Sequence, residues 1–237
     1  MIKIKFSKQL GIGMPKGFPL PIYEKIHSIM CSQKQKYPQS VSEFLHAWNA
    51  VAYRFYTCAE SNEGFTESFR KVGDAPPQPK RYIQEKDLFH FFVNGYSTLE
   101  SFCYALYMVA STVKPIFFPI RPSNLESIYI GTTCDKFNSG RVGFSNERIT
   151  VKLNQLQNSP EFKEWKTIRH TLIHRIAPGR KIQLQSGSIK KRVKTSWKIN
   201  NNITIDIDEY TTSSRFSWLE DSLFKLMDAT QDFAYNI

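Results

Sequence analysis

The stretch SPEFKEWKTIRHTLIHRIAPG, residues 159–179, decides the fold class, because it carries the clearest boundary signals in the chain. Ser159 is a favoured residue immediately before a helix, and Pro160 suits the first helical position. The Pro-Gly pair at 178–179 ends the segment. The sequence therefore predicts a helix over 160–176.

One face of this predicted helix is apolar and contains an arginine. At 100° per residue, an arc of about 140° holds every large apolar side chain of the segment. These residues are Phe162, Trp165, Ile168, Leu172, Ile173 and Ile176. Arg169 falls inside the arc, whereas His170 and His174 lie side by side beyond its edge. A guanidinium in an apolar stripe needs a partner or a wet cleft. Arg169 either packs its stem along the core, bonds a carboxylate, or has a functional role.

In other segments, too, apolar residues recur with the period of a helix. These cover roughly 41–60, 82–112 and 214–235, and a shorter helix is compatible with 22–32. Ser40 with Glu43, and Ser217 with Glu220, stand at capping-box spacing near the start of two of them. Gly95 interrupts the longest segment and is interpreted as a tolerated weak point.

The remaining regions lack this period. Residues 1–39 are irregular, and 113–152 is either a functional loop or a set of short elements. Residues 180–208 contain three short alternating runs separated by Ser-Gly-Ser and Asn-Asn-Asn, which predicts an antiparallel β meander. We therefore expect a mainly helical single domain over 1–237, a bundle of four to five helices with a basic β appendage at 180–208.

Composition narrows the class of protein. The chain has 237 residues, of which 41% are hydrophobic, and its net charge is +11. It contains no apolar run long enough to span a membrane, and its start lacks the apolar core of a signal peptide, so we expect a cytoplasmic protein without membrane contact. Its four cysteines are scattered, which disfavours a disulfide framework or a zinc cage. The basic excess suggests a polyanionic partner.

The string Arg169-His-Thr-Leu-Ile-His174 matches the R-x4–6-H motif of HEPN domains. The apolar residues on both sides of this string also resemble those of the motif helix in such proteins. The segments 82–112 and 214–235 are similar to other helices of their bundle. A polar residue often follows the motif arginine in that family, and here it is His170. The resemblance implies a HEPN-like helical bundle, and the β appendage departs from a minimal one.

The resemblance implies a metal-independent endoribonuclease that needs no cofactor and acts as a homodimer with two facing motifs. Cleavage of RNA through its own 2′-hydroxyl requires a proton acceptor, a proton donor and a cation for the phosphorane. We assign His174 to acid–base chemistry, Arg169 to phosphate and transition-state binding, and His170 to phosphate orientation or a second proton site. The family context implies phage defence, as the toxin of a toxin–antitoxin pair or an abortive-infection effector, with an antitoxin or another protein controlling it.

A basic stretch directly follows the motif helix. Its seven cations are Arg180, Lys181, Lys190, Lys191, Arg192, Lys194 and Lys198. The stretch has no acidic residue and includes Trp197, so it is predicted to bind an RNA backbone and to stack a base on the indole. A solvated hairpin whose lysines discourage edge pairing is the alternative.

Three other functions remain open. The first is a metal-dependent hydrolase that uses His170 and His174, which are four residues apart, the spacing of paired metal ligands, although no HExxH pattern or third ligand is evident. A non-catalytic HEPN module that binds RNA or a protein partner would carry the same motif. A DNA-binding helical protein is disfavoured, because no helix-turn-helix spacing is present.

Overall fold

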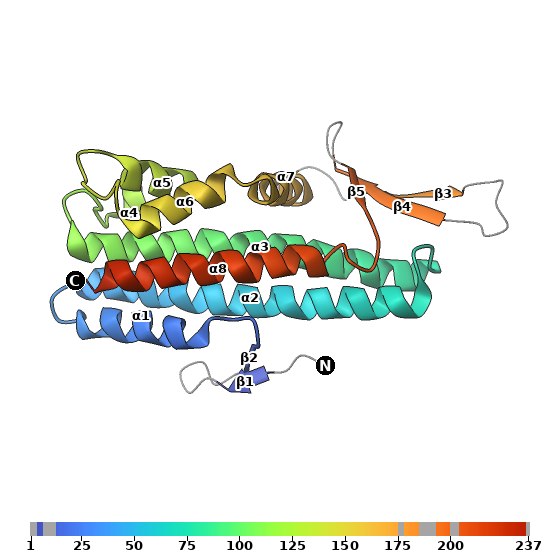
Figure 1. The fold of residues 1–237 in the computed structure, drawn as a ribbon, viewed down its shortest axis with the longest axis horizontal. Coiled ribbons are helices and arrows are strands. Elements are labelled where there is room, and N and C mark those ends of the chain that lie inside the picture. Colours follow the sequence, from blue (N-terminus) through green and yellow to red (C-terminus); the bar gives the residue numbers. More distant parts are fainter. Residues whose placement is uncertain (1–3, 7–12, 175–177, 185–192, 200–203, 236–237) are drawn as a thin grey trace. The chain divides into compact units, whose positions relative to one another are not determined.

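The computed structural model describes residues 4–6, 13–174, 178–184, 193–199 and 204–235. The helices in these ranges are α1 (Leu20–Ser32), α2 (Pro38–Val72), α3 (Gln78–Val113), α4 (Pro122–Leu125), α5 (Ile130–Asn138), α6 (Arg148–Asn158), α7 (Pro160–His174) and α8 (Ser213–Ala234). The strands are β1 (Ile4–Phe6), β2 (Gly13–Pro15), β3 (Arg180–Leu184), β4 (Val193–Lys198) and β5 (Thr204–Asp206). The expected fold class, mainly helical with a small antiparallel sheet after the motif helix, is confirmed (Figure 1).

Contacts group the chain into two compact units, which we describe separately. Unit 1 comprises the described residues within Tyr56–Tyr96 and Pro160–Leu219, and unit 2 comprises those within Lys3–Phe55, Ser97–Ser159 and Glu220–Ile237. Helices α2, α3 and α8 each contribute one part to each unit. The single domain over 1–237 stays a prediction.

The long helices extend beyond their predicted bounds, and both predicted capping boxes are wrong. Helix α2 begins at Pro38, where proline occupies the first position without losing a helical hydrogen bond. Ser40 therefore lies inside α2 and is buried, and its Oγ accepts a hydrogen bond from Ser111 Oγ at 2.9 Å. Ser217 lies inside α8, which begins at Ser213.

The region 113–152 contains short elements: α4, α5 and the start of α6. Aromatic packing within unit 2 holds it together. Phe137 lies 5.5 Å from Phe118 and 5.4 Å from Phe144 between ring centroids, and Phe144 meets Phe233 of α8 edge-on at 4.9 Å. These contacts join residues distant in sequence, so a helical period within the region does not reveal them.

Unit 2 also fixes α1 against α2. The rings of Tyr23 and Trp48 stack with 4.9 Å between centroids and 5° between planes. Trp48 Nε1 donates to the Tyr23 carbonyl at 3.2 Å, and the Tyr23 hydroxyl donates to the Trp48 carbonyl at 3.2 Å. Strand β1 pairs antiparallel with β2, so part of the region interpreted as irregular forms a short two-stranded sheet.

Unit 1 contains the predicted meander. Strands β3, β4 and β5 form one antiparallel sheet in chain order, shown in orange in Figure 1. Arg180 pairs with Trp197, and Ser196 pairs with Asp206. None of the helices in the described ranges combines the length and apolar character needed to cross a membrane.

Candidate functional site on helix α7

Helix α7 begins at Pro160, as predicted, and its described part ends at His174. Phe162, Trp165, Ile168 and Leu172 are buried, as the apolar arc predicted. Two further residues show that the buried face is rotated from the predicted one. Thr171 is buried, whereas the Ile173 side chain is 41% exposed. Ile176 lies outside the described residues.

Trp165 anchors α7 to α3 within unit 1. The indole is fully buried, with its ring centroid 5.1 Å from Phe91 and 5.6 Å from Phe92. A Cβ added to Gly95 would lie 1.8 Å from Trp165 Cζ3, far inside van der Waals contact. Gly95 is therefore required for this close approach, and its interpretation as a tolerated weak point is wrong.

Arg169 lies over an aromatic ring of α3. The Arg169 Cζ atom is 5.7 Å from the centroid of Tyr96, and Tyr96 itself stacks on Phe162 at 5.6 Å. Arg169 is half-buried in this position. A cation over the face of a ring is attracted by the ring quadrupole, which compensates part of the desolvation of the guanidinium. This contact accounts for a cation inside the apolar arc.

The two histidines lie together on the exposed side of α7. His170 and His174 are both exposed, and their ring centroids are 5.0 Å apart with 50° between the planes. Five helical residues correspond to a rotation of about 140°, so Arg169 and His174 leave the helix in different directions. Within one chain the structure brings the two histidines together and directs Arg169 to Tyr96.

Two lysines on the same exposed side were missed in the sequence analysis. Lys163 and Lys166 are exposed, and the helical rotation places both near His170. The same rotation applied to every charged residue, instead of the apolar ones alone, would have found them. The exposed face of α7 thus presents two lysines and two histidines, and we call these four residues the α7 basic face.

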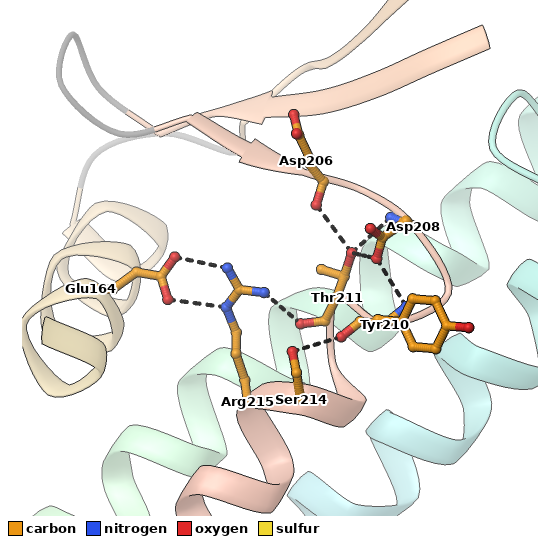
Figure 2. Close-up of polar contacts among 7 residues, drawn as sticks. All are labelled: Glu164, Asp206, Asp208, Tyr210, Thr211, Ser214 and Arg215. Atoms are coloured by element: carbon orange, nitrogen blue, oxygen red, sulfur yellow. Dashed lines mark hydrogen bonds and ion pairs between the residues drawn. The ribbon is translucent and has the colours of Figure 1, made fainter. Parts of the chain in front are cut away.

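A network of hydrogen bonds connects α7 with the segment that leads into α8 (Figure 2). Arg215 donates to both carboxylate oxygens of Glu164, and its Nη1 donates to the Thr211 carbonyl at 2.7 Å. Thr211 Oγ1 in turn donates to the Asp206 carbonyl at 3.1 Å and contacts Asp208 Oδ1 at 3.1 Å. Glu164 belongs to α7 and Asp206 to β5, so these bonds link the helix with the sheet.

The predicted RNA contact of Arg180 is wrong, because its side chain is only 1% exposed. Its Nε atom lies 2.8 Å from Glu85 Oε1, and its Nη1 donates to Gln84 Oε1 at 2.6 Å. Burial lowers the pKa of Arg180, and the nearby Glu85 carboxylate opposes this shift. The guanidinium attaches the sheet to α3 within unit 1, so it does not face solvent.

The predicted base-stacking role of Trp197 is also wrong. Its side chain is 2% exposed, and its ring centroid lies 6.3 Å from Phe92. Of the remaining basic stretch, Lys181 and Lys198 are exposed. Lys190, Lys191 and Arg192 lie outside the described residues, and Lys194 is described only as a strand position that pairs with Gln183.

Among the residues that the structure describes, no group of three or more His, Cys, Asp or Glu side chains could hold a metal ion. A metal site at His170 and His174 would therefore need ligands from outside the described ranges or from a second chain.

Comparison with protein-family models, curated proteins and solved structures returns no match for this chain.

Proposed function

We propose that this chain is a HEPN-type, metal-independent endoribonuclease whose reacting groups lie on α7. The carrying observation is the exposed His170–His174 pair, with 5.0 Å between ring centroids, on a helix that also holds Arg169 and two exposed lysines. Two adjacent imidazoles supply a proton acceptor and a proton donor. The lysines supply the positive charge that attracts a polyanion.

In the proposed reaction, the 2′-oxygen of RNA attacks the adjacent phosphorus and the 5′-oxygen leaves. His174 removes the 2′-hydroxyl proton, and an imidazolium returns a proton to the leaving oxygen. Arg169 stabilises the charge of the phosphorane. Because Arg169 and His174 leave the helix in different directions, the proposal includes a homodimer in which one copy's arginine complements the other copy's histidines.

We further propose a cellular role for this activity. The enzyme acts in the cytoplasm as a toxin or phage-defence effector, and an antitoxin or another protein controls it. Resemblance of the Arg169–His174 motif to that of HEPN proteins is the support for this part.

Cleavage of a labelled RNA in the presence of EDTA tests whether the chain is a metal-independent ribonuclease. We expect products ending in a 2′,3′-cyclic phosphate, and activity at least about 100-fold lower in Arg169→Ala and His174→Ala. His46→Ala is the matched control, since His46 is also an exposed helical histidine but lies in unit 2. Full activity in both α7 variants, with circular dichroism verifying the fold, would exclude the assignment.

A non-catalytic RNA- or partner-binding module is the second candidate. The Arg169–Tyr96 contact favours it, because the contact gives the motif arginine a packing role. Arg169→Lys separates the two functions. A catalytic arginine loses most activity in this variant because lysine cannot form two parallel hydrogen bonds to a phosphate. If Arg169 has only a packing role, Arg169→Lys changes the stability of the fold and nothing else.

A further inference from the structure

Helix α3 carries three aromatic residues at intervals of seven positions, Tyr82, Phe89 and Tyr96. Seven residues rotate a helix by about 700°, only about 20° short of two full turns. Each ring therefore leaves α3 on almost the same side as the one before it, about 10.5 Å further along the axis. All three residues belong to unit 1, and we call them the α3 aromatic row.

The α3 aromatic row runs from solvent to the candidate site. Tyr82 is 68% exposed, Phe89 is 38% exposed and Tyr96 is 6% exposed. The buried ring of Tyr96 stacks on Phe162 and lies under the guanidinium of Arg169. A chain molecule that follows the row from its exposed end therefore arrives at the motif arginine.

Cations accompany the exposed part of the row. Lys86 lies one turn after Tyr82 on the same side of α3, and 49% of its side chain is exposed. His90 is exposed directly beside Phe89, with 5.7 Å between the two ring centroids. The neighbouring carboxylate of Asp87 lies 3.7 Å from Lys86 Nζ, but only 14% of its side chain is exposed. The row thus presents aromatic rings and a lysine to solvent together.

The α7 basic face continues this surface beyond Tyr96. Lys166 is exposed and lies one turn after Phe162, so the two side chains share one side of α7. Phe162 is the residue that stacks on Tyr96. The row on α3 and the basic face on α7 therefore adjoin near Tyr96, within one compact unit.

We propose that the α3 aromatic row binds single-stranded RNA, with bases stacked on Tyr82 and Phe89 and the backbone directed toward Arg169. This inference rests on the proposed function and adds the form of the substrate to it. Stacking on a protein ring needs an unpaired base, and every base has a face that can stack. The row therefore selects single strands over duplexes without selecting a sequence.

The spacing of the rings constrains the bound strand. Bases that stay stacked on one another are about 3.4 Å apart, whereas the two exposed rings are about 10.5 Å apart along the axis of α3. The strand must therefore be extended between Tyr82 and Phe89. Lys86 lies between the two rings and can contact a phosphate of the extended segment. The net charge of +11 also favours a polyanionic partner.

Fluorescence anisotropy with a labelled 2′-O-methyl RNA of about 12 nucleotides tests the proposal. This strand lacks the attacking hydroxyl, so the measurement reports binding alone. We expect Tyr82→Leu and Phe89→Leu each to weaken binding at least about fivefold, because leucine is apolar but has no ring face. Tryptophan at either position should keep the affinity. Tyr53→Leu is the matched control, since Tyr53 is a 58% exposed tyrosine of α2 in unit 2.

An abasic strand with the same length and backbone separates stacking from charge. The unchanged chain should bind it at least about fivefold more weakly than the strand with bases. The double variant Tyr82→Leu with Phe89→Leu should bind the two strands equally, with circular dichroism verifying its fold. The same preference for bases in the double variant and in the unchanged chain would overturn the proposal.

The outcomes separate this proposal from that of the enzyme. Cleavage of ordinary RNA, with neither leucine variant altering affinity, would overturn the role of the row and leave the enzyme intact. Affinity that depends on both rings, without any cleavage, would support the row and contradict the enzyme. Light scattering measures the mass of each variant. A change from dimer to monomer together with lost affinity would assign the row to contact between copies and overturn the proposal.

Discussion

Arg215 and Glu164 form a two-pronged ion pair that holds α7 to the first turn of α8 (Figure 2). Arg215 Nε lies 3.0 Å from Glu164 Oε2, and Arg215 Nη2 lies 2.8 Å from Glu164 Oε1. The same guanidinium lies 5.9 Å from the centroid of Phe92. The orientation of α7, and so of its basic face, depends on a partner far along the chain.

Loss of this ion pair should destabilise the fold. We expect Glu164→Ala to lower the free energy of unfolding by about 1–2 kcal/mol, because the pair is bidentate but its side chains are partly exposed. Urea denaturation of Glu164→Ala, Arg215→Ala and the double variant measures the coupling. A coupling free energy indistinguishable from zero would contradict the importance of the pair.

Gly95→Ala should be destabilising even though alanine favours helices. Helix propensity alone would raise stability by about 1 kcal/mol. The new Cβ would lie 1.8 Å from Trp165 Cζ3, so we expect a net loss of about 1–3 kcal/mol as α7 moves away from α3. Gly140→Ala is the control, with no atom within 4 Å of its added Cβ. A stabilised Gly95→Ala protein would show that the contact relaxes easily.

Glu85 should stabilise the fold through its bond to the buried Arg180. Glu85→Ala removes an acceptor 2.8 Å from Arg180 Nε, and we expect a loss of about 2 kcal/mol. Glu85→Gln keeps an acceptor and should lose less. The free energies of unfolding of both variants, compared with Glu67→Ala on the surface, test this order. Equal losses in the alanine and glutamine variants would argue against it.

Glu85 should also make the stability of the fold depend on pH. Burial raises the pKa of Glu85, and the Arg180 charge only partly opposes this effect. The folded state then binds the Glu85 proton more tightly than the unfolded state does. Its contribution to stability is full below the ordinary glutamate pKa and is lost as the pH rises through the raised value. Denaturation between about pH 4 and pH 7 should show this decline, and Glu85→Gln should lack it.

The α7 basic face should contribute to the salt dependence of RNA binding. If Lys163 and Lys166 each contact one phosphate of a single strand, their reversal to glutamate lowers the slope of log affinity against log salt by about 1.4 or more. Lys34→Glu with Lys36→Glu is the matched control, because both lysines are exposed in unit 2. An equal slope change in the two double variants would show that only net charge matters.

Local signals in the sequence were sufficient for the start of α7 and for the presence of the meander. The start of α7 follows from Ser159 and Pro160, and the three-stranded meander follows from short alternating runs separated by turn residues. The same signals misplaced the start of α2, because Ser40 at capping-box spacing is instead buried inside the helix. Capping spacing is a local pattern, and packing against other segments overrides it.

For the candidate site, the sequence identified which side chains are unusual but not what they contact. Arg169 stood out by its place in an apolar arc, and its partner Tyr96 is 73 positions away. Charge counting placed Arg180 in an RNA surface, yet it pairs with Glu85 inside unit 1. Counting charges cannot distinguish a buried cation from an exposed one.

By itself, the sequence determined the helical class, the start of α7 and the neighbouring positions of His170 and His174, because these depend on residues a few positions apart. Only the tertiary structure decided which cations face solvent. Burial depends on contacts between distant segments, such as those that cover Trp197 and Arg180 and leave Lys163 exposed.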